Sequence, residues 1–395
     1  MDRKSANQKI KSRLHALAAL LIVLAATTQA SAFSIRPEIT KAADDIRNFE
    51  APDRYPGDWF RQAATKMFST PVHERATNMI YGCQGDEKDC NPRGKGKMAP
   101  AAVLAGAEWN DNPPFQLKST SDAACKAYLG ATVSAAVAPE CWYVLFRDGE
   151  KGAAQGTYYD AGSGNVILYR VHYGDLQFLH SMANRDGEAP SATKKQIMMW
   201  AEFAYKTAKG DIKRGQPLNR TKIAGMTELF PKGETGQLLF LREDRTYQSD
   251  SDFKGFAFGT LIHMIEDSFS DSHAEREIPD GSLCGGAAST YPMPGRVKTF
   301  HSYARQDKDK HKAADSQAAL NNGLAKIDPT AVTVGQTLKT MLESETDWQV
   351  VKSYLDCAYS LAEDAQASGP GEKYATAPRR TAANMGNGGN DAGTP

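Results

Sequence analysis

The sequence has few histidines and no second long apolar run, and neither sign of charge predominates in it. Only 8 of its 395 residues are histidine, and 47 Lys and Arg balance 47 Asp and Glu. Beyond the first thirty residues no apolar stretch is long enough to cross a bilayer, so we expect the rest of the chain to be soluble. The balanced charge offers no general attraction for a polyanion such as a nucleic acid. With 41% hydrophobic residues, the chain is still able to bury the core of one large domain or two average ones.

The first 32 residues have the pattern of a secretory signal peptide. Five Lys and Arg lie within residues 1–13, an apolar run extends from Leu14 to about Thr27, and Ala30-Ser31-Ala32 matches a small-x-small cleavage site. The apolar run is too short for a membrane span. We therefore predict an exported bacterial protein, secreted or periplasmic, whose mature chain starts near Phe33. Removal of this segment leaves 42 basic against 46 acidic side chains, a net charge of about −4.

Cysteine occurs six times, and no C-x-x-C pair is present. An even count in an exported chain indicates disulfides rather than a metal site. Proximity in the sequence favours the pairs Cys83–Cys90 and Cys125–Cys141, which leaves Cys284–Cys357 to close a long loop. Six cysteines allow fifteen connectivities, so this pairing is a prediction.

Hydrophobic periodicity predicts a mainly α fold. Helices are expected from 71 to 80, within 101–116 up to the stop at Trp109–Pro114, and over 173–183, 191–208, 253–270, 308–327 and 347–361. The helix from Phe253 to Ser270 is apolar on nearly all sides, so it should be buried and central. Cys141–Phe146 and Asn165–Tyr169 are predicted as β-strands of a small insertion over 118–170. The predicted organisation is a signal peptide (1–32), one domain (33–367) and a disordered tail (368–395).

The predicted central helix carries the residues with the clearest chemical meaning. His263 and Asp267 are four residues apart, so they lie on one face of that helix. A histidine and a carboxylate buried among apolar side chains need a partner, and both are standard ligands of Zn²⁺. His273 follows the helix end, where it is able to reach a second ion. A second His-x-x-x-Asp pair, His311 and Asp315, occurs in another predicted helix.

In order and spacing these residues resemble the zinc-dependent phospholipase C and nuclease P1 superfamily, and are closest in character to exported bacterial zinc phospholipases C. The signature of that superfamily is a His-x-x-x-Asp helix, a His six residues after that Asp, and a later His-x-x-x-Glu or His-x-x-x-Asp. Asp267 and His273 are six residues apart. The resemblance implies a multi-helix phospholipase C/P1 nuclease-like domain, here with a small β-containing insertion, that binds two or three zinc ions.

The resemblance also implies which residues bind each ion. Asp111 in Trp-Asn-Asp and His180 in Gln-Phe-Leu-His-Ser-Met look like the upstream ligands of the first zinc, and His73 looks like a ligand of the third. The implied sets are Asp111, His180, His263 and a bridging Asp267 for zinc one; His273, His311 and Asp315 for zinc two; and His73 with Asp267 for zinc three. His172 remains a rival to His180, and His301 a rival to His311.

The function implied by the resemblance is hydrolysis of phosphate esters, because zinc supplies a hydroxide at neutral pH and neutralises charge on phosphate oxygens. Asp111 would take the proton of the attacking water, as is inferred for the family. We expect a phospholipase C that releases diacylglycerol and a phosphorylated head group from phosphatidylcholine-like lipids, with transient contact to a membrane surface. Two alternatives stay open: a P1-type single-strand nuclease, which the charge balance does not favour, and a secreted helical domain in which zinc is structural.

Overall fold

A computed structural model describes residues 72–84, 90, 98–135, 137–163, 166–241 and 249–376. The predicted signal peptide and the start of the mature chain lie outside these residues. Within the described ranges, no helix is both long enough and apolar enough to cross a membrane.

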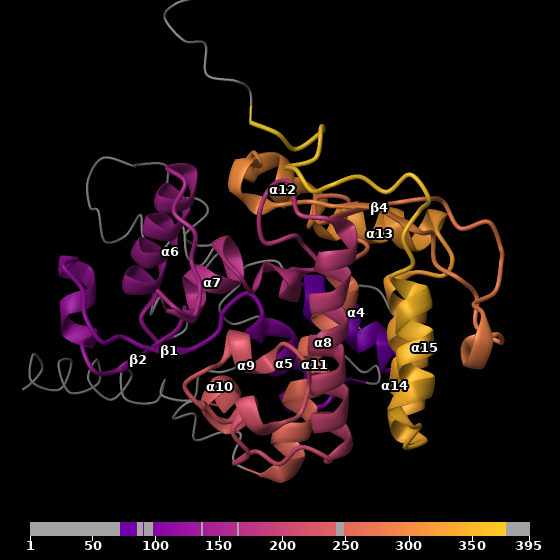
Figure 1. Cartoon of the computed structure of the whole chain (residues 1–395), viewed down its shortest axis with the longest axis horizontal. Helices are drawn as coiled ribbons and strands as arrows, with labels where there is room; N and C mark the ends of the chain where they lie inside the picture. Colours follow the sequence, from indigo (N-terminus) through magenta and orange to yellow (C-terminus); the bar gives the residue numbers. More distant parts are fainter. Residues whose placement is uncertain are drawn as a thin grey trace, which may run out of the picture.

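The described chain is mainly helical, which confirms the predicted class (Figure 1). Its helices are α4 (Val72–Ile80), α5 (Ala101–Trp109), α6 (Pro139–Ala154), α7 (Ile167–Tyr173), α8 (Pro190–Lys209), α9 (Met226–Leu229), α10 (Gly236–Leu241), α11 (Asp250–Asp267), α12 (Lys308–Ala314), α13 (Gln317–Lys326), α14 (Ala331–Glu343) and α15 (Trp348–Ala358). Two small antiparallel sheets pair β1 (Phe115–Gln116) with β2 (Thr132–Val133) and β3 (Ala274–Arg276) with β4 (Val297–Phe300).

Helix α11 lies at the centre of the fold, packed against α5 and α8 (Figure 1). A capping box of Ser249 and Asp252 starts it, and every residue from Phe256 to Asp267 is buried. The backbones of α5 and α11 nearly touch, because a Cβ on Gly106 would lie 2.1 Å from the carbonyl oxygen of Phe256. This close approach brings the end of α5, where Asp111 follows, next to the buried polar face of α11.

Residues 115–173 form a lobe with a hydrophobic core of its own, which includes Trp142, Leu145 and Phe146. The predicted strand Cys141–Phe146 is wrong: these residues lie in α6, where the buried side chains repeat at helical spacing and Pro139 occupies the first turn. Of the second predicted strand, Asn165–Tyr169, residues 167–169 lie in α7, and Asn165 lies outside the described residues. Among the described residues of the lobe, the strands are β1 and β2, which pair over two residues each.

Two of the predicted helices are interrupted. Over 308–327, α12 ends at Ala314 with Asp315 as its C-cap, and the side chain of Ser316 accepts a hydrogen bond from the N–H of Ala319 to start α13. Over 173–183, α7 ends at Tyr173, and a short 3₁₀ helix, Gln177–His180, stops at Ser181, whose φ is 50°. Both breaks leave a predicted metal ligand, Asp315 or His180, at the end of a helix.

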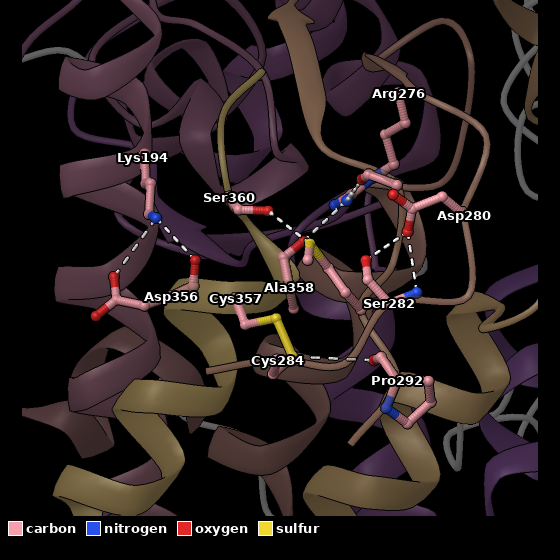
Figure 2. Close-up of a disulfide and its surroundings, with 12 residues drawn as sticks. Lys194, Arg276, Asp280, Ser282, Cys284, Pro292, Asp356, Cys357, Ala358 and Ser360 are labelled. Atoms are coloured by element: carbon pink, nitrogen blue, oxygen red, sulfur yellow. Dashed lines mark hydrogen bonds and ion pairs between the residues drawn. A yellow bond between two sulfur atoms is a disulfide. The ribbon is translucent and has the colours of Figure 1, made fainter. Parts of the chain in front are cut away.

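All three predicted disulfides are present: Cys83–Cys90, Cys125–Cys141 and Cys284–Cys357. Figure 2 shows the third, which joins the loop after β3 to α15. Close to it, the partly buried Arg276 donates to the carbonyl oxygens of Ser268 at 2.7 Å and Ala358 at 2.8 Å. The disulfide and Arg276 therefore fix α15 and the C-terminal end of α11 to β3 and the loop that follows it.

The part of the predicted tail that is described, residues 368–376, makes backbone hydrogen bonds to the domain. The N–H of Ser302 donates to the carbonyl of Gly369 at 2.8 Å, and the N–H of Asp307 donates to that of Tyr374 at 2.6 Å. The rest of the predicted tail lies outside the described residues.

Candidate metal centre

The eight residues implied as zinc ligands come together from separate parts of the fold. His263 and Asp267 lie on the last turns of α11, His73 on α4 and His311 on α12, while the others lie at or just beyond element ends. Those are Asp111 after α5, His180 at the end of a 3₁₀ helix, His273 before β3 and Asp315 at the end of α12. Their ligand atoms form three groups, each within 4.8 Å, that could hold a metal ion: His73, Asp111 and His263; His180, His263 and Asp267; and His273, His311 and Asp315.

Asp267 lies between these groups and uses both of its oxygens. Its Oδ2 is 2.9 Å from His180 Nδ1 and 2.9 Å from His263 Nε2, and its Oδ1 is 3.4 Å from His73 Nε2. His273 Nδ1 is also 3.5 Å from Oδ2. Ligand atoms of one tetrahedral zinc lie about 3.3 Å apart, so these spacings suit ions on both sides of the carboxylate.

Asp111 lies at the open side of the same group. Its Oδ1 is 3.8 Å from His180 Nδ1 and 4.0 Å from His263 Nε2. Its side chain is 40% exposed, whereas that of Asp267 is 3% exposed. The cluster is therefore closed around Asp267 and accessible from solvent at Asp111.

Asp315 is the centre of the remaining group. Its Oδ2 is 2.8 Å from His311 Nε2 and 3.1 Å from His273 Nε2. Its Oδ1 accepts hydrogen bonds from the hydroxyls of Ser270 and Ser272. The serines leave Oδ2 to face the two imidazoles.

In the deeper part of the cluster, each histidine uses one ring nitrogen to donate a hydrogen bond to a backbone carbonyl. His263 Nδ1 donates to the carbonyl of Ala107 at 2.6 Å, and His180 Nε2 donates to that of Asn110 at 3.1 Å. A carbonyl only accepts, so in the neutral form of each ring the other nitrogen is a bare lone pair that points at Asp267. His263 Nε2 and His180 Nδ1 also lie 3.1 Å from each other. Lone pairs and a carboxylate that converge in this way require a cation between them, either a proton or a metal ion.

The rings of His273 and His73 are also held through one nitrogen each. His273 Nδ1 lies 2.7 Å from the carbonyl of His180, which it contacts as a donor, and its Nε2 faces Asp315. His73 Nδ1 lies 2.8 Å from Glu266 Oε2, and its Nε2 faces Asp267. Metal-bound histidines typically use the second nitrogen in this way, and such a bond fixes the tautomer and the ring orientation.

The carboxylates at the centre of the cluster remain ionised. Burial by itself would raise the pKa of Asp267, but His263, His273 and His73 outweigh it and hold that pKa well below its usual range. The imidazoles lower the pKa of Asp111 and of Asp315 against burial in the same way. A metal ion in the cluster would take over the charge compensation that protonated imidazoles otherwise provide.

His172 and His301, the two rivals, lie outside the three groups. His172 Nε2 donates to the carbonyl of Asp111 at 2.9 Å, and its ring stacks on that of His180. Burial lowers the pKa of His172 to about 3, so the ring is neutral. His301 Nδ1 lies 3.1 Å from the carbonyl of Ser272. Proximity therefore favours His180 and His311 over their rivals.

Sequence reasoning missed several side chains that hold the cluster in place. Glu266 is buried and accepts a hydrogen bond from Thr77 Oγ1 at 2.8 Å as well as contacting His73. Ser181 donates to the carbonyl of Met264 at 2.6 Å, which fixes the residue after His180 to α11. Gln306 Oε1 lies 2.5 Å from His311 Nδ1. The only sequence signal for any of these is the position of Glu266 beside Asp267, since the other contacts depend on the fold.

The chain matches no family model, no curated protein and no solved structure.

Proposed function

We propose that this protein is an exported zinc-dependent hydrolase of phosphate esters, and that its substrate is a glycerophospholipid. The observation that carries the proposal is the arrangement around Asp267: histidines of all three groups face this buried carboxylate, while Asp111 beside it is open to solvent. A purely structural zinc site is closed by four protein ligands, whereas a catalytic site keeps a position open. The three disulfides are typical of proteins from oxidising compartments, which supports export.

The donor set favours zinc. It consists of imidazole nitrogens and carboxylate oxygens without thiolates, and the spacings around Asp267 and Asp315 suit tetrahedral ligation. Asp111, His180, His263 and Asp267 would hold one ion, and His273, His311 and Asp315 a second. His73 and Asp267 would contribute to a third, with Asp111 and His263 close to the same position. When bound, the ions would supply a water of lowered pKa and positive charge toward the phosphate oxygens.

Asp111 is the residue of the cluster best placed to handle a proton. Its carboxylate is the most exposed of the three in the cluster. Partial burial raises its pKa, but the facing imidazoles outweigh this and lower the pKa, so the group stays ionised. A charged carboxylate at the mouth is able to accept the proton of an attacking water at Oδ1 or Oδ2. Asp267 and Asp315 lack this role, since their oxygens are taken up by histidine and serine contacts.

The choice of lipid over nucleic acid depends on charge. The chain without residues 1–32 carries a net charge of about −4, and polyanion binding draws on many Lys and Arg contacts. A zwitterionic head group presents one phosphate and one cation, so it needs little beyond the metal cluster and transient contact with a membrane surface.

The experiment compares two substrates at equal zinc and moderate salt. Purified protein should release phosphocholine from a short-chain phosphatidylcholine faster than nucleotides from single-stranded DNA, and a chelator should abolish both until Zn²⁺ is restored. Faster nucleotide release would replace the lipid proposal with a P1-type nuclease. Bound zinc with no hydrolysis of either substrate would leave the structural zinc domain as the better account.

A matched pair of variants tests the role of Asp111. Asp111→Asn should lose most activity, because the amide cannot accept the proton. Asp160→Asn changes a carboxylate outside the three groups that accepts hydrogen bonds from the backbone and side chain of Ser163 in its own turn, so it should retain the wild-type rate. Equal activity in both variants would contradict the assigned role.

A further inference from the structure

The described C-terminal segment, residues 368–376, pairs with the segment that leads into α12; we call it the C-terminal strap. Its backbone is hydrogen-bonded to the segment between β4 and α12 at three points, through Ser302, Arg305 and Asp307. Gly371 of the strap covers His301, and a Cβ there would lie 2.6–2.8 Å from the imidazole ring atoms. The strap therefore packs on the segment that leads into α12, the helix that carries His311 and is followed by Asp315.

Gln306 connects this strap to His311. The side chain is buried and its Nε2 donates to two carbonyl oxygens, those of Ser272 at 2.7 Å and of Pro370 in the strap at 2.8 Å. Its Oε1 lies 2.5 Å from His311 Nδ1. The amide thus joins the segment before His273, the strap and the His311 ring.

These bonds determine the orientation of the Gln306 amide. An amide NH₂ has two protons, and here both face carbonyls that only accept. The Oε1 atom must therefore point at His311, which obliges His311 Nδ1 to be the donor. In the neutral ring this leaves the Nε2 lone pair directed at Asp315 Oδ2, 2.8 Å away.

We propose that Gln306 is a positioning residue for the second metal ion, and that the C-terminal strap keeps it in place. The amide selects the His311 tautomer and ring orientation that an ion at His273, His311 and Asp315 needs. The strap acts through the carbonyl of Pro370, so the affinity for this ion depends on a segment that contributes no ligand itself. The inference rests on the proposed metal centre.

The first test measures how many zinc ions each variant retains against chelators of graded affinity. Gln306→Leu should lower the affinity for one zinc ion about 10- to 100-fold, the usual effect of removing such a supporting hydrogen bond. The affinity for the other ions should stay unchanged. Gln306→Glu keeps an acceptor for the His311 N–H but loses both donors to the carbonyls of Ser272 and Pro370, so it should recover only part of that affinity. Unchanged retention in Gln306→Leu would overturn the proposal, as would equal weakening of every equivalent, which marks general loss of structure.

The second test moves the strap without touching Gln306. Gly371 has φ +79° and no room for a Cβ, so Gly371→Ala should displace the strap and weaken the same zinc equivalent, by about tenfold. Gly369→Ala is the matched control, because nothing lies within 4 Å of a Cβ at that position. Equal zinc retention in the two variants would overturn the role of the strap.

The outcomes separate this inference from the proposed function. If the wild-type protein binds no zinc, the metal centre itself is wrong. If it binds zinc and the Gln306 and Gly371 variants retain it fully, only the positioning role fails.

Discussion

His263 and Asp267 lie one turn apart on the buried helix α11, with His263 Nε2 2.9 Å from Asp267 Oδ2. Because His263 Nδ1 already donates to the carbonyl of Ala107, the neutral ring can offer only a lone pair to the carboxylate. His180 approaches the same oxygen in the same state, also at 2.9 Å. This convergence, deep in the core, is the strongest reason to expect a cation at this position.

Substitution of Asp267 and of Asp315 should remove different numbers of zinc ions. Asp267 faces histidines of different groups with its two oxygens, so Asp267→Asn should lose more than one equivalent of zinc. Asp315 directs only Oδ2 at His273 and His311, so Asp315→Asn should lose about one. Elemental analysis of the two purified variants checks this. Equal losses would show that Asp267 does not bridge.

Zinc binding should release protons. Burial alone would lower the pKa of His273, but the charges of Asp267 and Asp315 outweigh it and raise the pKa to about 10. The metal-free protein therefore keeps this ring protonated near neutral pH, and zinc must displace the proton because only the neutral ring ligates. Affinity for zinc should rise as the pH increases toward that pKa, about tenfold per pH unit for each proton released.

Calorimetric titration in buffers of different ionisation enthalpy gives the number of protons released. We expect at least one per chain at neutral pH, and fewer in Asp315→Asn, which lacks one of the two charges that raise the pKa of His273. Zinc binding without proton release at neutral pH would show that the cluster is already deprotonated.

The contact between α5 and α11 should tolerate no added side chain. A Cβ on Gly106 would overlap the backbone of Phe256, so Gly106→Ala should cost about 1–3 kcal/mol or more in unfolding free energy and weaken zinc binding, because Asp111 follows α5. Gly323→Ala in helix α13 is the control, since nothing lies within 4 Å of a Cβ there. It should be neutral or slightly stabilising through helix propensity. Denaturant unfolding compares the two, and equal stability would contradict the close packing.

Local patterns in the sequence predicted the parts of the fold that depend on neighbours along the chain. The position of His263 and Asp267 on one helix face follows from their spacing of four residues. The predicted helix 347–361 begins where the side chain of Asp347 accepts a hydrogen bond from the nearby N–H of Gln349. The error at Cys141–Phe146 has a local cause too: a short apolar run fits a strand as well as a helix until its packing partners are known.

The remaining site contacts join residues far apart in sequence, and periodicity contains no information about them. Asp111 and His73 were expected near α11 only through the family resemblance. Gln306 carries no sequence signal, because its role arises from the carbonyls of Ser272 and Pro370 that the fold places around it. The predicted tail began too early for a similar reason, since the hydrogen bonds of residues 368–376 are made to distant segments.

The most direct test of the metal centre is an anomalous difference map from crystals of the protein, with data collected on both sides of the zinc absorption edge. We predict strong peaks at the group of His180, His263 and Asp267 and at the group of His273, His311 and Asp315, with a further peak beside His73 if a third ion binds. Peaks that appear only above the edge identify zinc. A map with no peak within bonding distance of Asp267, from protein purified without chelator and supplied with zinc, would contradict the account.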